Sequence, residues 1–357
     1  MTDIYNKTAI FGLTAGLILG LASCATLEQE APYVAPTEGM FPVTAAFETP
    51  LVGSAGDSAD DPAIFVHENG SGFIAGTDKQ AGLHIYTLEG EARDFFPLGT
   101  LNNVDLREDF VVDGNPHVLL VASNDEKKNI TALLYNPATD VFLTDMTSLL
   151  AIKPEPYGIC LGMVGEDYQV GVTTKAGIYY QYNIAYNSEG FALSKVREFP
   201  TGTKTEGCVF DDRTQTLYIA EEAGGLYRYA AAPSAGDDQT VIGRPGQFGL
   251  MADLEGVTVY PEGEDGGYLL VSSQGNDSYV AFTLPDHQFA GQFEIVEGVV
   301  DRTTVTDGID VTAKSTERFP DGFFVVQDNQ NSEDAAEDFE QQNFKVVDWR
   351  DIEAGLR

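Results

Sequence analysis

The amino-acid sequence predicts an all-β chain folded as a six-bladed β-propeller, and three observations support this. The 357 residues include 37 Gly, 16 Tyr and 21 Phe, a composition typical of short strands joined by tight turns. Six similar polar openings recur along the chain at spacings of 42, 54, 49, 49 and 52 residues. Between them no long stretch has helical periodicity, which disfavours βαβ architectures. A period of about 40–50 residues with several strands per repeat is typical of a propeller.

Each opening is followed by a short apolar strand, a polar turn and a second apolar strand, and most units continue with a third strand. The openings are residues 61–64, 103–106, 157–160, 206–209, 255–258 and 307–310. Strands are also expected near the two ends of the chain, at residues 43–47 and 343–349. We expect these two end strands to share one blade and thereby close the ring.

The first 40 residues are expected to hold an export signal and a linker. Residues 9–22 form an apolar stretch of 14 residues, which has the length of a signal-peptide core and is too short to span a bilayer. The stretch ends in Leu21-Ala22-Ser23-Cys24, which resembles a bacterial lipobox, in which the cysteine becomes the lipidated mature N-terminus. An ordinary cleaved signal is the alternative.

The domain prediction follows from these features. We expect a lipoprotein signal peptide over residues 1–23, a flexible tether over 24–40, the propeller over 41–352 and a C-terminal tail over 353–357. The protein is expected to be exported, as an outer-membrane or cell-surface lipoprotein or else as a periplasmic or secreted protein. Membrane contact is expected only through a lipid anchor at Cys24, and the protein is expected to be a monomer.

Charge and cysteine content limit the partners. The 56 Asp and Glu residues outnumber the 20 Lys and Arg residues, for a net charge of −36. Such a surface repels phosphate backbones, so no nucleic acid partner is expected. Cys160 and Cys208 could pair in an oxidising compartment or remain two buried free thiols. The absence of a Cys-x-x-Cys pair argues against a thiolate metal site.

The repeat also brings acidic residues together. In a propeller blade the first strand lines the central channel and the second runs antiparallel to it, so the start of one meets the end of the other at a single rim. A single Asp or Asn at such a turn is usually a turn former. Many like charges on one rim repel each other, however, and oxygen ligands without histidine favour Ca²⁺ as the ion that offsets this repulsion. With a few lysines nearby, several Ca²⁺ ions would create an anion site suited to phosphoester hydrolysis.

The residues at these openings resemble a known family. Asp57-Ser58-Ala59-Asp60-Asp61-Pro62-Ala63 is similar to the Asp-x-x-Asp-Asp-Pro-Ala motif of the β-propeller phytases, the calcium-dependent bacterial 3-phytases. Further similar segments follow in family order, at residues 101–107, 205–207, 218–222, 252–256, 272–276, 306–310 and 343–346. The resemblance implies hydrolysis of myo-inositol hexakisphosphate (phytate) by direct attack of a calcium-activated water. It also implies a cleavage subsite beside an affinity subsite for a second phosphate.

The resemblance further implies roles for individual residues. Its implied calcium ligands are Asp60, Asp61, Asp105, Glu206, Asp253, Glu255, Asp301, Asp307, Asp328 and Asn331. Its implied catalytic residues are Glu206, near the attacking water, then Tyr157, Lys79 and Lys175, which would contact phosphate oxygens, and Glu221, which would order metal or water. Two departures from the family pattern, Gln80 and Asp125, concern the affinity subsite, where Lys127 or Lys128 is expected to substitute for an arginine.

Two other functions stay open. One is a non-catalytic surface propeller that binds calcium or an anionic polymer, and the other is a different calcium-propeller hydrolase such as a lactonase. Motifs of other phosphatase chemistries are absent, including Arg-His-Gly, Cys-x5-Arg and a Walker-type loop. The sequence therefore requires no covalent nucleophile.

Overall fold

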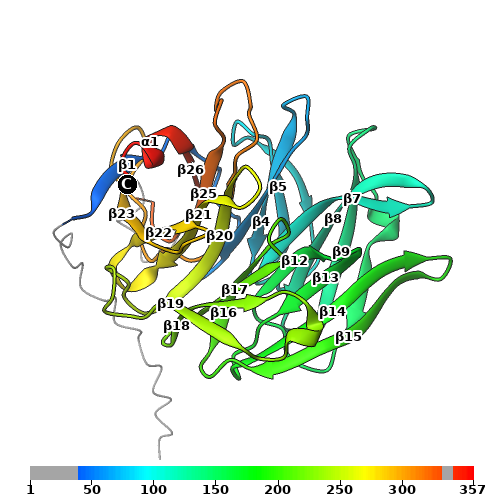
Figure 1. Ribbon diagram of the computed structural model, residues 1–357. Coiled ribbons are helices and arrows are strands. Elements are labelled where there is room, and N and C mark those ends of the chain that lie inside the picture. The colour runs from blue at the N-terminus through cyan, green and yellow to red at the C-terminus, as the bar shows by residue number, and fades with distance from the viewer. Residues whose placement is uncertain (1–38, 332–340) are drawn as a thin grey trace, which may run out of the picture. The chain divides into compact units, whose positions relative to one another are not determined.

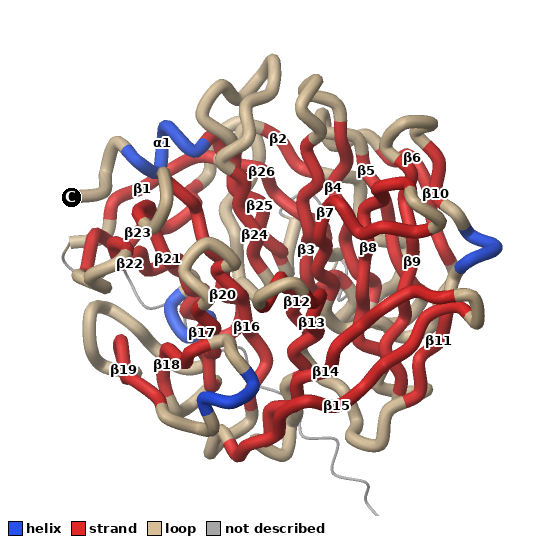
Figure 2. The backbone as a smooth tube through the Cα atoms, turned by 45° about the vertical axis from the view of Figure 1, so that its right-hand side comes forward, coloured by secondary structure: helices blue, strands red, loops and turns tan. Residues whose placement is uncertain are grey.

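The computed structural model describes residues 39–331 and 341–357, all within one compact unit, Val34–Arg357. In this part the strands form six sheets set around a common centre, and the expected six-bladed propeller is confirmed (Figures 1 and 2). The expected signal peptide, the Cys24 anchor and nearly all of the tether lie outside the described residues. No helix within the described ranges is long and apolar enough to cross a membrane.

The first three blades follow each other along the chain, each with its strands in order from the centre outwards. Blade one contains β3 (Ala59–Val66), β4 (Gly72–Asp78), β5 (Gly82–Tyr86) and β6 (Ala92–Phe96). Blade two contains β7 (Val104–Val112), β8 (Asn115–Asn124), β9 (Asn129–Asn136), β10 (Val141–Phe142) and β11 (Ser148–Ala151), the last two both paired with β9. Blade three contains β12 (Ile159–Val164), β13 (Asp167–Val172), β14 (Ile178–Asn187) and β15 (Gly190–Pro200).

The last three blades include the strands near both chain ends. Blade four contains β16 (Thr205–Asp211), β17 (Thr216–Glu221), β18 (Gly225–Ala230) and β19 (Gln239–Gly243). Blade five contains β20 (Leu254–Glu262), β21 (Gly266–Ser273), β22 (Ser278–Leu284), β23 (Phe289–Val296) and β1 (Phe41–Thr44). Blade six contains β24 (Ile309–Thr312), β25 (Phe323–Asp328), β26 (Asn343–Asp348) and β2 (Phe47–Glu48). The helical elements are η1 (Thr144–Met146), η2 (Pro233–Ala235), η3 (Gln274–Asn276) and α1 (Trp349–Glu353).

Ring closure follows the prediction only in part. β2 pairs antiparallel with β26, with Phe47 opposite Val346, so the two ends of the chain do share blade six. The expected single strand over residues 43–47 is wrong, because β1 pairs in parallel with β23 of blade five instead. The reason is burial: Val43 packs with Phe293 in one hydrophobic cluster, whereas Phe47 packs against another cluster that includes Phe344.

The hydrophobic core lies between blades. In the described part of the chain, six hydrophobic clusters occupy the six junctions between neighbouring blades. Between blades one and two, the Phe73 and Tyr135 rings meet edge to face with centroids 5.0 Å apart. Between blades five and six, the Tyr260 ring stacks on Trp349 at 3.8 Å. Each blade is therefore held by apolar contacts on both faces, and the inner strands are fixed around the centre.

Two further features complete the frame. Cys160 on β12 and Cys208 on β16 form a disulfide, so the alternative of two free thiols is excluded and blades three and four are covalently joined. At the other end, the boundary expected at residues 352–353 falls inside α1. The following residues also contact the propeller, since the backbone N–H of Arg357 donates to the carbonyl of Ala290.

Candidate active site

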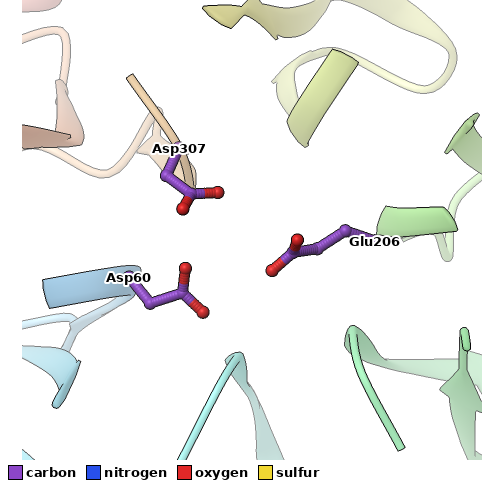
Figure 3. Close-up of side chains that lie close together, drawn as sticks. All are labelled: Asp60, Glu206 and Asp307. Atoms are coloured by element: carbon purple, nitrogen blue, oxygen red, sulfur yellow. The ribbon is translucent and has the colours of Figure 1, made fainter. Parts of the chain in front are cut away.

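Three carboxylates converge where inner strands of three blades begin. Asp60 lies at the start of β3, Glu206 at the start of β16, and Asp307 two residues before β24. Figure 3 shows their carboxylates pointing toward one another, and one oxygen from each lies within 4.8 Å of the other two. Residues more than 240 positions apart in the sequence thus meet at one rim, as the repeat predicts.

Glu206 also belongs to a second carboxylate group, with Glu222 and Glu255, under the same 4.8 Å limit. Glu222 directly follows β17, whose last residue, Glu221, lies opposite Thr205 at the start of β16. The end of β17, the second strand of blade four, therefore lies beside the start of β16, the first strand of the same blade. We call the five residues of the two groups (Asp60, Glu206, Glu222, Glu255 and Asp307) the carboxylate cluster.

Burial makes the negative charges of this cluster costly. Removal from water, together with the charge of Asp307, raises the pKa of Glu206 to about 7. Burial also raises the pKa values of Asp60 and Glu255 well above their usual range, and the neighbouring carboxylates add to it. Among the described residues, none donates a hydrogen bond to Oδ2 of Asp60 or to Oε2 of Glu255. Unpartnered buried carboxylate oxygens of this kind are typical of a cation site.

One lysine partly neutralises the cluster. Lys79 Nζ lies 3.0 Å from Asp60 Oδ1, 3.3 Å from Asp307 Oδ2 and 3.0 Å from Asp57 Oδ1. Burial alone would lower the pKa of Lys79, but Asp60 and Asp307 raise it well above its ordinary value. The ammonium group is therefore charged at neutral pH. A single positive charge nevertheless leaves several carboxylates unbalanced, so the donor set fits one or more Ca²⁺ ions.

A polar pocket of about 280 Å³ lies beside the carboxylate cluster. The residues that line it are Asp57, Lys79, Leu101, Asn102, Asp125, Tyr157, Lys175 and Lys204. Two ammonium groups lie over the Tyr157 ring, Lys175 Nζ at 4.6 Å and Lys204 Nζ at 4.8 Å from its centroid. Burial and the charge of Glu206 raise the pKa of Tyr157, so its hydroxyl stays protonated. Three lysines and a phenol thus surround a space suited to an anion.

Two of the implied ligands, Asp61 and Asp105, are not members of the two carboxylate groups, although Asp61 lies near enough to Glu206 for that charge to raise its pKa. Asp61 follows Asp60 directly, but its Oδ2 accepts a hydrogen bond of 3.0 Å from the backbone N–H of Val104. Asp105 Oδ2 accepts one of 2.7 Å from the N–H of Leu161. Both carboxylates line a small pocket with Asp310 between the inner strands. Asp61 and Asp105 each accept a hydrogen bond from the inner strand of the next blade, so each carboxylate links two neighbouring inner strands.

Another set of implied ligands surrounds a lysine. The ammonium group of the fully buried Lys345 lies 2.7 Å from Asp328 Oδ2, and it also contacts Asp301 and Glu48. Asn331 lies nearby, where its Oδ1 accepts a hydrogen bond from Asn343 Nδ2. The structure places these residues in blade six and, for Asp301, in the segment that joins blades five and six, and none of them belongs to the carboxylate cluster.

The remaining implied residues lie around the rim. Glu221 Oε2 accepts hydrogen bonds from the N–H and hydroxyl of Thr203. Asp253 is half-buried and lies near enough to Glu222 to raise its pKa. Lys127 donates to the carbonyl of Leu98 and Lys128 pairs with Glu155, and neither lines the pocket.

Two residues of the site, Lys204 and Asn102, were missed by the sequence interpretation. Lys204 pairs with Glu222 at 2.9 Å and lines the pocket. Asn102 Nδ2 donates a hydrogen bond of 2.6 Å to Glu206 Oε1 and orients that carboxylate. They lie one and two residues before identified openings (103–106 and 206–209), so extending each opening by two residues toward the N-terminus would have found them.

The fold and the site together define a six-bladed propeller whose rim combines buried carboxylates with a lysine-lined anion pocket. The model of the phytase family matches residues 7–357 of the chain. A 3-phytase from Bacillus subtilis is 37% identical over 360 residues, which cover 97% of this chain and 92% of that protein. A solved luciferin-regenerating enzyme is similar in fold alone, with a TM-score of 0.52 at 11% identity over 82% of this chain and 92% of that one. The chain belongs to the phytase family.

Proposed function

We propose that this protein is a calcium-dependent phytase that releases inorganic phosphate from myo-inositol hexakisphosphate. Membership of the phytase family supports the substrate. The single observation that supports the site is the convergence of Asp60, Glu206 and Asp307 beside a pocket lined by three lysines. A non-catalytic surface propeller would need no such meeting of buried carboxylates with an anion pocket.

The residues of the pocket bind and orient the phosphate. Lys175 and Lys204 lie on the face of Tyr157 and present two ammonium groups to anionic oxygens, and Lys79 presents a third from the side of Asp60. The protonated Tyr157 hydroxyl is a further hydrogen-bond donor. Several separate cations suit a substrate that carries many phosphate groups, because two phosphates can be held at once.

Glu206 is the proposed proton acceptor. Asn102 fixes one of its carboxylate oxygens by a hydrogen bond of 2.6 Å, which places the other oxygen to accept a proton. With no ion bound, burial raises its pKa to about 7. Water attacks phosphorus, the bond from phosphorus to the inositol oxygen breaks, Glu206 takes the proton that the water loses, and the leaving inositol oxygen takes up a proton from solvent. The reaction therefore needs no covalent intermediate between the protein and the substrate.

Calcium is the proposed cofactor. Asp60, Glu206, Glu222, Glu255 and Asp307 would hold it, because their buried oxygens outnumber the available donors. Bound there, calcium would neutralise the negative charge of the phosphate and lower the pKa of a nearby water. We propose the other implied ligands, in the inner-strand pocket and around Lys345, as further sites for ions.

Export is also proposed. The Cys160–Cys208 disulfide supports an oxidising compartment, because such bonds are rare in reducing cytosol. The proposed route is lipidation at Cys24 after cleavage of the signal peptide. Membrane fractionation of the wild type and of a Cys24→Ser variant tests it, and equal distribution of the two proteins would contradict the anchor.

Phosphate release from phytate tests the function. We expect release to stop with a chelator, to return with added calcium, and to fall by about a hundredfold or more in Glu206→Gln. Glu89→Gln is the matched control, because Glu89 is exposed and outside the site. Full activity of Glu206→Gln, or activity in the presence of chelator, would contradict the proposal. Cleavage of lactones without phosphate release would favour the rival hydrolase.

A further inference from the structure

One position recurs at or directly after the end of the second strand of every blade, next to the rim. The six residues at this position are Thr77, Ser123, Thr173, Ala220, Ser272 and Gln327. The strand register shows that these positions are equivalent. In each blade the residue directly follows the second-strand member of the first residue pair in the regular ladder between the first and second strands; Thr77, for example, follows Gly76, which pairs with Pro62. Those with a polar side chain are at most 2% exposed.

Four of these side chains are hydroxyls that donate to the next blade. The hydroxyl of Thr77 donates to the carbonyl of Asn102 at 2.6 Å, and that of Ser123 to the carbonyl of Tyr157 at 2.6 Å. The hydroxyl of Thr173 donates to the carbonyl of Glu206 at 2.8 Å, and that of Ser272 to the carbonyl of Asp307 at 2.8 Å. Every acceptor is the backbone of a residue in the proposed site.

Three of the same hydroxyls also accept a bond from their own blade. The backbone N–H groups of Asp61, Asn103 and Gly256 donate to Thr77, Ser123 and Ser272 at 2.9, 3.0 and 2.8 Å. Strand ladders join backbones within one blade. Between blades the hydroxyls act beside the carboxylate links of Asp61 and Asp105 and the Cys160–Cys208 disulfide. A hydroxyl that accepts from one inner strand and donates to the next is therefore a direct polar link between blades.

Glycines allow these links. A Cβ atom on Gly158 would lie 1.9 Å from the carbonyl oxygen of Glu206, and one on Gly308 would lie 2.6 Å from that of Asp60. The backbones of adjacent blades are thus too close for any side chain at these points. This contact leaves the buried carbonyl of Glu206 dependent on a protein donor, which Thr173 supplies.

We infer that these buried hydroxyls form a belt that positions the site residues across blade boundaries, with Thr173 as the positioning residue for Glu206. The inference rests on the proposed function, because it assigns the belt a role in that reaction. None of the hydroxyls touches the pocket, so they are positioning residues and not catalytic ones.

The belt is not symmetrical. Blade four has Ala220 at this position and supplies no hydroxyl toward Glu255. Blade six has Gln327, whose Oε1 accepts from the N–H of Asp307 at 3.1 Å, and there the N–H of Gly308 donates to the carbonyl of Asp60 at 3.1 Å. The hydroxyl links therefore serve Asn102, Tyr157, Glu206 and Asp307.

Substitutions at Thr173 test the inference. Thr173→Val removes the hydroxyl and keeps the shape, and Thr173→Ser keeps the hydroxyl. The matched control is Thr131→Val, because Thr131 is equally buried in the third strand of blade two and its hydroxyl bonds only toward Asn129. Two quantities are measured: kcat and KM for phytate, and hydrogen exchange of the peptide covering residues 205–209, which does not depend on turnover.

We expect Thr173→Val to lower kcat by about tenfold with little change in KM, as a displacement of less than 1 Å would, and to speed exchange in residues 205–209. Thr173→Ser restores both quantities, and Thr131→Val changes neither. Wild-type kcat and exchange in Thr173→Val would overturn the inference, as would equal damage in Thr173→Ser, because packing rather than the hydroxyl would then be responsible.

The two proposals can fail separately. If the wild type releases no phosphate, the proposed function fails, and the exchange comparison alone decides whether the belt exists. If Thr173→Val does not fold, Ser123→Ala takes its place, since it removes the donor to the Tyr157 carbonyl without adding atoms. Exchange is then measured at residues 157–161, and an unchanged rate would overturn the inference.

Discussion

Replacement of Gly207 by alanine is expected to damage both stability and activity, because of a single close contact. Gly207 follows Glu206 on β16, and a Cβ atom there would lie 2.0 Å from the carbonyl oxygen of Glu255. Real Cβ atoms essentially never approach closer than 3.0 Å. The inner strands of blades four and five must therefore separate by about 1 Å to accept one methyl group, and the atom in the way is backbone.

This displacement is expected to lower both the unfolding free energy and the catalytic rate. Overpacking of this kind costs about 1–3 kcal/mol of unfolding free energy. A misplacement of about 1 Å in a catalytic arrangement costs about a hundredfold in rate, and both Glu206 and Glu255 belong to the carboxylate cluster. We therefore expect Gly207→Ala to unfold at a lower temperature and to lose about a hundredfold in kcat for phytate.

The assay combines thermal unfolding followed by circular dichroism with phosphate release from phytate. The control is Gly53→Ala, because a Cβ atom on Gly53 meets nothing within 4 Å. Gly53→Ala should match the wild type in both measurements. The reasoning is refuted if Gly207→Ala has the melting temperature and kcat of the wild type.

Three other predictions follow from the same structure. Replacing Cys160 and Cys208 together by alanine should lower the unfolding free energy in guanidinium by about 2–4 kcal/mol, because the bond closes a 48-residue loop; an unchanged midpoint would contradict this. In the absence of calcium, burial raises the pKa values of Glu206 and Asp310 to about 7, above their unfolded values near 4, so the native state holds more protons than the unfolded state. Unfolding free energy with chelator should therefore fall between about pH 4 and pH 7, and a rise over this range would show that these groups are ionised. Lys204→Gln should raise KM for phytate by about tenfold, since one charge-assisted contact is lost; an unchanged KM would place the phosphate elsewhere.

The sequence could predict the propeller because its repeat is encoded in local patterns. Openings such as Asp307-Gly308 recur with the same strand pattern behind them, and each one begins an inner strand or directly precedes it. The same logic placed Asp60, Glu206 and Asp307 at one rim. It could not predict that Asp60 and not Asp61 joins the carboxylate cluster, because this depends on the direction in which each side chain points. Successive residues of a strand point to opposite faces, and a bulge at the start of β3 sets which face each one takes.

Other features depend on contacts that no local pattern contains. Residues 43–47 are apolar except for Thr44, but only the positions of two different clusters show that the segment divides between blades five and six. The cysteine spacing allows pairing without requiring it, and the adjacency of β12 and β16 settles the matter. Lys345 has an ordinary strand sequence around it, and its contact with Asp328 appears only when blade six is assembled.

The central claim is that the buried carboxylates of several blades bind calcium at one rim. Anomalous diffraction from crystals soaked in calcium tests it most directly, because it locates the ions independently of any activity. Peaks are expected within about 2.3–2.6 Å of carboxylate oxygens of Glu206 and of its neighbours Asp60, Asp307, Glu222 or Glu255. A crystal saturated with calcium that shows no peak beside Glu206 would contradict calcium binding at this rim.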